Sequence, residues 1–461
     1  MDTGEWIMKK HRIPALILVL AVLCSLLCLP AAAAEADLQL QCKSAILMDA
    51  DYGQVLYEQQ AYEKAFPASM TKVMTALLTL EAIEDGTISA ETMVTVSDYA
   101  ARKDFANEST ANLLSGEQMS VIDLLYCLML PSANDAAKAL AEHSGGSADS
   151  FAEKMNQRAE ELGCRNTHFL NPNGLHDENH YSCAYDIALM FRQAMSHELF
   201  LKIIGTAEYT TAATNLSGER ILYNTNGLIS NLYYSGYVYE KCIGGKTGTT
   251  SSAGKCLVSA AHNGEYPIIS VIMGADLITA EDGSSRQGQF VESTRLFEYG
   301  FQNFRPVTLS RPDEVVASVA VALSEDGTDV GLIPQGSISL VLPYTVTEET
   351  IQTQITLTEE SVTAPVEEGQ VMGTLRFYQG DETFGELELV AERSMSFSEK
   401  LLRKQNRQAF WDKNGGWIIT VLILIPVLPV AALLTLRFIN IQRRKRRRKR
   451  RRAAAHTQIT K

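Results

Sequence analysis

Ser69 and Lys72 lie three residues apart in the segment Pro-Ala-Ser-Met-Thr-Lys, residues 67–72. Residues at this spacing share one face of a helix, so the lysine amine can reach the serine hydroxyl. A serine hydroxyl is a weak nucleophile at neutral pH and needs an adjacent base. Lysine can be that base when burial or a neighbouring cation lowers its pKa. The pair therefore indicates a serine nucleophile, although a capping serine beside a solvated lysine is the commoner meaning of this spacing alone.

Two further short motifs follow along the chain. Ser132 and Asn134 flank a single alanine, and Lys246, Thr247 and Gly248 are consecutive, with gaps of about 60 and 110 residues between the three motifs. Alone, the first reads as a helix cap and the second as a turn. Together with the serine and lysine they supply a nucleophile, a base, a second hydroxyl and a cation. These are the parts that acyl transfer requires.

A buried helix is expected to present the first pair. Pro67 suits a first helical position, and Gly86 follows Asp85 where a helix needs a left-handed stop. Between them apolar residues leave almost no polar stripe, which is typical of a buried helix. These residues are Val73, Met74, Ala76, Leu77, Leu78, Leu80 and Ile83.

The neighbouring segments predict helices around an antiparallel sheet. Residues 44–58 read as a hairpin around an Asp-Tyr-Gly turn, and residues 255–261 and 268–274 read as two adjacent strands, with the Lys-Thr-Gly motif between strands. Helical patterns cover residues 119–130 and 184–195. This arrangement indicates the α+β class. After Phe304 short apolar runs and turns recur to Ala391, which predicts a small all-β domain.

Both ends of the chain carry membrane signals. Three basic residues, an apolar run and the small residues 31–34 form a secretory signal peptide. Residues 417–436 are free of charge and long enough to cross a bilayer of about 30 Å. The ten basic residues 443–452 follow, which predicts a cytoplasmic tail that binds anionic lipid and a body outside the cell. The expected divisions are 1–34 signal, 38–304 catalytic domain, 305–392 β domain, 393–416 linker, 417–438 transmembrane helix and 439–461 tail.

The charge between the two ends argues against a nucleic-acid partner. Residues 36–436 contain 26 Lys and Arg against 51 Asp and Glu, a net charge of −25. Six cysteines lie beyond the signal and none forms a Cys-x-x-Cys pair, so a zinc site is not expected and no cofactor is required. Their pairing cannot be fixed from sequence, although Cys127 reads as a core residue. His168, His176 and His180 are interpreted as solvated loop residues.

The three motifs in this order resemble those of the serine D-Ala-D-Ala carboxypeptidases of bacterial cell-wall synthesis, the low-molecular-mass penicillin-binding proteins. The resemblance extends over about residues 40–391. It includes the segment 169–175 with His180, Tyr181 and Asp186, and Ala364-Pro365, Gly369 and Gly373 in the β domain. Cys183 departs mildly, because threonine is expected there.

The resemblance implies a fold and a reaction. The fold is a penicillin-binding domain followed by a small all-β domain and a C-terminal transmembrane helix. Ser69 would attack the penultimate D-Ala of a peptidoglycan stem peptide, Lys72 would accept its proton, and Ser132 would relay a proton to the leaving amine. β-Lactams would acylate the same serine.

The remaining site residues are expected to bind the substrate. Asn134 would orient the substrate amide, and Lys246 and Thr247 would bind the terminal carboxylate. Gly248 would let the substrate run close to the strand. The backbone N–H groups of Ser69 and Thr249 would form an oxyanion hole.

Three alternatives stay open. A class A β-lactamase would need a glutamate-bearing loop for fast deacylation, and none is identified in the sequence. A transpeptidase or endopeptidase could use the same motifs. From a different class, a non-catalytic β-lactam or muropeptide sensor would be acylated without turnover.

Overall fold

A computed structural model describes residues 38–280, 283–347 and 349–457, so the expected signal peptide at 1–34 lies outside the described residues. By its internal contacts the chain forms two compact units. The first contains the residues up to Val307 together with residues 340–345, and the second contains residues 308–339 and those from 346 onward. The chain therefore returns once to the first unit after entering the second.

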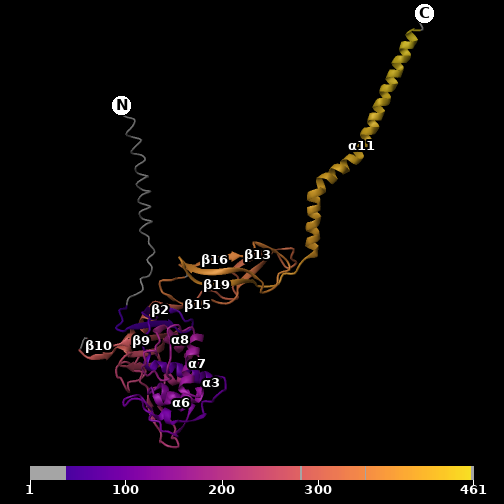
Figure 1. The fold of residues 1–461 in the computed structure, drawn as a ribbon. Helices are drawn as coiled ribbons and strands as arrows, with labels where there is room; N and C mark the ends of the chain where they lie inside the picture. The colour runs from indigo at the N-terminus through magenta and orange to yellow at the C-terminus, as the bar shows by residue number, and fades with distance from the viewer. Residues whose placement is uncertain (1–37, 281–282, 348, 458–461) are drawn as a thin grey trace, which may run out of the picture. The chain divides into compact units, whose positions relative to one another are not determined.

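A five-stranded antiparallel sheet forms the centre of the first unit (Figure 1). Its order is β2 (Val55–Gln59), β1 (Ser44–Asp49), β9 (Pro267–Ala275), β8 (Gly254–His262) and β7 (Cys242–Thr250). The predicted hairpin and the predicted pair of neighbouring strands are both confirmed. The predicted position of the Lys-Thr-Gly motif between strands is wrong, because the motif lies within β7.

Both faces of this sheet are covered. Along β1, Ile46 and Met48 face one hydrophobic cluster, whereas Ala45 and Leu47 face another. This alternation follows from the two-residue period of a strand. Helix α8 (Ala184–Met195) packs on one face, and α10 (Gly288–Asn303) contributes Phe290 and Phe297 to the other. A sheet buried on both faces explains why its strands are continuous apolar runs in the sequence.

The larger cluster lies among the helices that follow the first hairpin. They are α3 (Lys72–Glu84), α4 (Asp98–Ala101), α5 (Val121–Met129), α6 (Asn134–Gly145), α7 (Ala148–Glu161), α8 and α9 (Glu198–Ile204). Short two-stranded pairs connect them: β3 (Met93–Thr95) with β4 (Gln118–Ser120), and β5 (Glu208–Thr210) with β6 (Ile221–Tyr223). The pair β10 (Leu277–Thr279) and β11 (Ser285–Gln287) precedes α10.

The segment that carries the first motif has two parts. A 3₁₀ turn, η1 (Ala68–Thr71), precedes α3, where the sequence predicts one helix from Pro67. Ala68 has a φ of +47°, a value that an α-helix cannot accommodate, so the turn stays distinct from α3. The helix ends at Glu84 with Asp85 as its C-cap, and Gly86 has a φ of +77°, which confirms the predicted left-handed stop. Most of α3 is buried, also as predicted.

The second unit is an antiparallel sheet with one parallel edge pair. Its order is β16 (Gln352–Leu357), β18 (Val371–Gln379), β19 (Glu382–Ala391), β14 (Asp329–Pro334), β13 (Ala317–Ala322) and β17 (Ser361–Thr363). The α+β class with a following all-β unit is thus confirmed. Strand β15 (Ser339–Pro343), which the sequence analysis assigned to the β domain, pairs instead with β12 (Phe304–Thr308).

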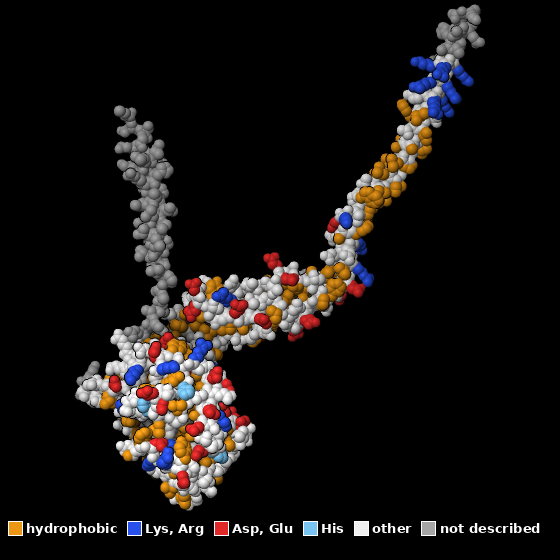
Figure 2. Space-filling view, in the orientation of Figure 1, with side chains coloured by type: hydrophobic (Ala, Val, Ile, Leu, Met, Phe, Trp, Pro, Cys, Tyr) orange, Lys and Arg blue, Asp and Glu red, His pale blue; other side chains and the backbone are white. Residues whose placement is uncertain are grey.

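A long helix, α11 (Glu399–Thr457), ends the described chain. Its central stretch is apolar and exposed, and by length and composition it is a candidate membrane span. Pro426 and Pro429 lie within it. Figure 2 shows basic side chains gathered beyond the apolar stretch, where residues 443–451 lie.

Candidate active site

The amine of Lys72 lies at the centre of the first two motifs. Its Nζ is 3.1 Å from Ser69 Oγ, 2.7 Å from Asn134 Oδ1 and 2.6 Å from the backbone oxygen of Asn173. The side chain of Lys72 is completely buried, whereas Ser69 is partly exposed. The sequence-predicted serine and lysine are therefore in contact, and Asn134 joins them from the first turn of α6.

The partners of this amine can satisfy its neutral form as well as its charged form. A neutral amine donates two hydrogens and accepts one through its lone pair, and two of the three partners are oxygens that can only accept. In the neutral form the lone pair is left for the Ser69 hydroxyl, whereas the charged form would donate to Ser69 Oγ as well. Burial lowers the pKa of Lys72 well below its usual value, and the charge of Lys246 lowers it further. These two effects favour the form that can accept a proton from Ser69.

The third motif meets the second across the site. Lys246 Nζ donates to Ser132 Oγ at 2.8 Å and to the backbone oxygen of Thr247 at 2.8 Å. Lys246 is also fully buried, and burial lowers its pKa to about 7. An arriving carboxylate would favour the charged form of this amine. The structure thus brings a cation-forming group and a second hydroxyl together beside the Ser69 and Lys72 pair.

Two non-glycine residues at the site adopt left-handed backbone conformations. Ala68, directly before the serine, has a φ of +47°, and Ser132 has a φ of +66°. Such conformations cost about 1–3 kcal/mol each and persist only where the surrounding structure holds them. Their position on both sides of the site supports a functional role for η1 and for the turn before α6.

Thr247 has a partner that the sequence analysis did not identify. Its Oγ1 lies 2.7 Å from Thr225 Oγ1, and Thr225 Oγ1 donates to the backbone oxygen of Leu130 at 3.2 Å. Because Thr225 gives its one hydroxyl hydrogen to Leu130, Thr247 donates to Thr225 here and must turn away from it to donate to a carboxylate. A single threonine in a loop carries no sequence motif, so only the tertiary contact could reveal it.

The turn-rich segment 169–175 packs against η1 and the start of α3. Besides the Asn173 oxygen on Lys72, the backbone oxygen of Pro172 accepts a hydrogen bond from Thr75 Oγ1 at 2.6 Å. Gly174 has a φ of +83°, and a Cβ there would lie 1.9 Å from the backbone oxygen of Ala68. Only glycine fits this approach.

The interpretation of His180 as a solvated loop residue is wrong. Its side chain is buried, its Nε2 lies 2.9 Å from Thr71 Oγ1, and its Nδ1 accepts from the backbone N–H of Leu170 at 3.1 Å. Burial lowers its pKa to about 4, so it is a neutral, structural residue that ties the segment to η1. His176 is exposed, and His168 is half-buried.

The backbone that faces Gly248 gives a second reason why this residue is glycine, besides the predicted approach of the substrate. A Cβ on Gly248 would lie 2.9 Å from the backbone oxygen of Pro67 and 3.2 Å from the backbone nitrogen of Ser69. The glycine therefore allows β7 to approach η1. Thr249 follows on the same strand, and its part in an oxyanion hole stays a prediction.

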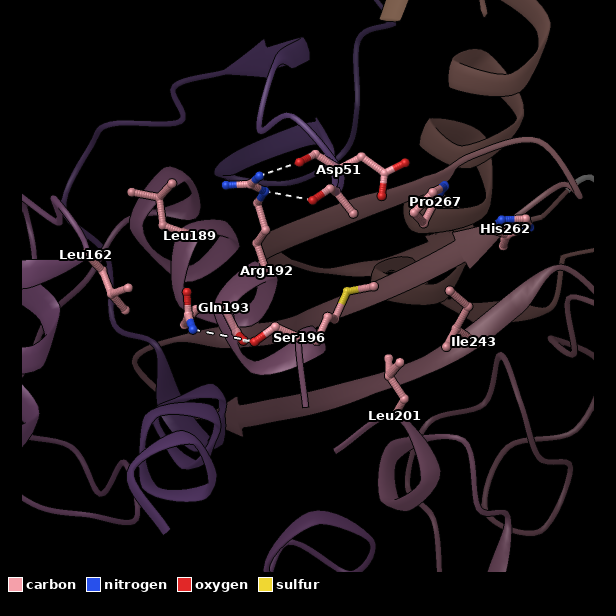
Figure 3. Close-up of a pocket in the computed structure, with 12 residues that line it drawn as sticks. Asp51, Leu162, Leu189, Arg192, Gln193, Ser196, Leu201, Ile243, His262 and Pro267 are labelled. Atoms are coloured by element: carbon pink, nitrogen blue, oxygen red, sulfur yellow. Dashed lines mark hydrogen bonds between the residues drawn. The ribbon is translucent and has the colours of Figure 1, made fainter. Parts of the chain in front are cut away.

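The described part of the chain also contains six cysteines and a separate pocket. Its six cysteines form no disulfide, and Cys127 is buried as predicted. A separate pocket lies beside α8 and α9, where Arg192 donates to the backbone oxygens of Ala50 and Asp51 (Figure 3). None of the residues that line it belongs to the three motifs. It therefore carries none of the chemistry described above.

Both units match known protein families. Residues 31–277 match the D-alanyl-D-alanine carboxypeptidase family, and residues 304–396 match the penicillin-binding protein 5 C-terminal domain. The chain is 32% identical over 377 residues to the D-alanyl-D-alanine carboxypeptidase DacF of Bacillus subtilis, covering 82% of this chain and 92% of the relative. It is 31% identical over 360 residues to DacA of Escherichia coli, covering 76% and 83%.

Solved structures agree with these relatives. Penicillin binding protein 5 from Haemophilus influenzae superposes with a TM-score of 0.63 at 28% identity, covering 78% of this chain and 98% of that chain. Penicillin binding protein 6B from Escherichia coli gives a TM-score of 0.59 at 29% identity, covering 76% and 95%. The similarity thus spans the helical and sheet unit and the β unit together.

Proposed function

The chain belongs to the D-alanyl-D-alanine carboxypeptidase family of serine hydrolases, and from this premise we propose how its residues release the terminal D-alanine of a peptidoglycan stem peptide. One observation carries the proposal. A fully buried lysine lies 3.1 Å from the hydroxyl of a partly exposed serine and is held there by two acceptor oxygens.

Acylation follows from this contact. The neutral Lys72 amine accepts the proton of Ser69 as Oγ attacks the carbonyl of the penultimate D-alanine. The backbone N–H groups of Ser69 and Thr249 donate to the oxyanion, a contribution of about 2.7–4 kcal/mol per donor. The peptide bond then breaks, and Ser132 relays the proton that Lys72 accepted to the departing amine of D-alanine, so that Lys72 is neutral again. The product is an ester between Ser69 and the shortened peptide.

The third motif selects a substrate with a free C-terminal carboxylate. Lys246 is buried and its pKa is about 7, so a carboxylate that arrives beside it favours the protonated, charged form. Thr247 adds a hydroxyl, which turns from Thr225 to donate to the carboxylate. A peptide whose C-terminus is amidated would lack the charge that this group binds.

Hydrolysis and inhibition share the same ester. Lys72 takes a proton from water as the water oxygen attacks the acyl carbon. The bond to Ser69 Oγ then breaks as that proton passes to Ser69 Oγ, and the shortened peptide leaves with a new carboxyl group. A β-lactam would form the same ester, but the amine released from its ring stays tethered to the acyl group. The penicillin-binding property follows from this shared step.

The assay that tests the proposal measures D-alanine released from a stem pentapeptide by the wild-type chain, together with its mass after incubation with a labelled penicillin. We expect repeated turnover of the peptide and one penicillin adduct per chain. A sensor would show the adduct without turnover. Absence of both signals would exclude the proposed reaction.

We also propose that α11 anchors the protein in the membrane through residues 417–438, with the catalytic unit outside the cell and the basic tail at 439–461 in the cytoplasm. The exposed apolar stretch and the basic residues beyond it support this orientation. Protease added to intact spheroplasts should degrade the catalytic unit and leave an epitope at the C-terminus protected. Loss of the epitope without prior lysis would contradict the orientation.

A further inference from the structure

The loop between α4 and β4 is fixed by the first turns of α6. Asp135 accepts from the backbone N–H groups of Ala111 at 3.0 Å and Leu113 at 2.9 Å. Lys138 donates to the backbone oxygen of Arg102 at 2.9 Å and to the carboxylate of Asp104. Because α6 also carries Asn134, the loop and the second motif form one unit.

Glu108 lies in this loop and reaches the motif directly. Its Oε2 accepts from Asn134 Nδ2 at 3.1 Å, and its Oε1 accepts from the backbone N–H of Asp104 at 3.0 Å. The side chain is half-buried. Each carboxylate oxygen of Glu108 therefore has one donor, and one of those donors is a residue of the active site.

This contact decides which way the Asn134 amide faces. A carboxylate accepts hydrogen bonds and repels an amide oxygen, so it must face the Nδ2 end of the amide. The Oδ1 end is then turned to Lys72 Nζ, 2.7 Å away. Without Glu108 the amide could rotate and present a donor to the Lys72 amine, where an acceptor is needed.

We propose that Glu108 is a positioning residue of this active site, which holds the Asn134 amide so that its oxygen faces Lys72 and its second Nδ2 hydrogen faces the substrate. The first part of this role concerns the free enzyme, and the second rests on the substrate contact proposed above for Asn134. The carboxylate also adds negative charge near the Lys72 amine.

The charge of Glu108 predicts a measurable effect on the pH dependence. The charged groups that act on Lys72 are Lys246 on β7, Asp135 on α6 and Glu108 in the loop. Both carboxylates favour the protonated lysine, whereas Lys246 and burial favour the neutral one. His180, which also lies near, has a pKa of about 4 and is neutral when the base is active. Removing the charge of Glu108 should therefore lower the pKa of Lys72.

The experiment uses the full chain in detergent and measures the second-order rate of acylation by a labelled penicillin as a function of pH. Glu108→Ala should reduce that rate about 10-fold at its optimum, the scale of one hydrogen bond to a charged group. Glu108→Gln should shift the acid limb of the profile to lower pH, because Lys72 then stays neutral in more acidic solution. Glu108→Asp keeps the charge, so its acid limb should remain at the wild-type position.

Two exposed residues provide matched controls. Asn107→Ala alters the neighbouring loop position, and Glu63→Gln removes a carboxylate elsewhere on the same unit. Both should leave the rate within about twofold and the acid limb in place. Melting temperatures of all variants show whether each is folded.

The inference is overturned if Glu108→Ala and Glu108→Gln acylate at the wild-type rate. It is equally overturned if both variants are acylated more slowly but the acid limb of Glu108→Gln stays at the wild-type pH. A residue that only holds the loop in place would lower the acylation rate by the same factor at every pH. Acylation is measured without turnover. A failure of D-alanine release by the wild type would therefore refute the proposed reaction and leave this test valid.

Discussion

Replacing Ser69 with alanine is expected to abolish D-alanine release and the penicillin adduct together. The reason is chemical, because both depend on an ester to Ser69 Oγ and alanine has no atom that can form it. Loss of a serine nucleophile costs about 10⁶-fold in turnover where it has been measured in a hydrolase. Ser69 is partly exposed and Lys72 keeps its contacts with Asn134 and the Asn173 oxygen, so the fold should survive.

The measurement is D-alanine release and intact mass after exposure to penicillin, with Ser196→Ala as the matched control. Ser196 lies by the separate pocket of Figure 3, and its Oγ donates to the backbone oxygen of Gln193 at 2.7 Å. The control variant should keep both signals. A Ser69→Ala chain that still gained the mass of penicillin would place the nucleophile elsewhere and refute the mechanism.

The second large effect is expected from Gly174→Ala. The added Cβ would lie 1.9 Å from the backbone oxygen and 2.5 Å from the backbone carbon of Ala68, so no side-chain rotation can relieve the collision. The segment must move, and with it the Asn173 oxygen that holds Lys72. We expect a destabilisation of about 4 kcal/mol or more, a melting temperature of the catalytic unit lower by about 10 °C, and loss of acylation by penicillin.

Gly163→Ala is the control that measures the cost of the positive φ without the collision. Gly163 has the same φ of +83°, but a Cβ there would meet no atom within 4 Å. It should cost only the left-handed conformation, about 1–2 kcal/mol, and acylation should persist. Equal melting temperatures for the two variants would show that the segment does not pack on η1 as described.

Local spacing explains what could be predicted from the sequence. Ser69 and Lys72 are three residues apart, so a helical turn alone brings them together. The three motifs, the buried helix, the strands of the central sheet and the following β unit all have short-range signatures. Two local predictions were wrong: the Lys-Thr-Gly motif lies within β7, and η1 is separate from α3. Both depend on the close packing of β7 against η1, which involves Gly248 and the positive φ of Ala68 and has no short-range signature in the sequence.

The order and spacing of the motifs in the sequence therefore determined the chemical class of this protein, a serine hydrolase, and predicted a lysine as the base for its serine. Only the tertiary structure decided what surrounds that lysine. The Asn173 oxygen is 101 residues from Lys72 along the chain, and Ser132 is 114 residues from Lys246. A backbone carbonyl has no residue signature, and the carboxylate of Glu108 has no motif around it. Such groups act through position, and position arises only when distant segments pack together.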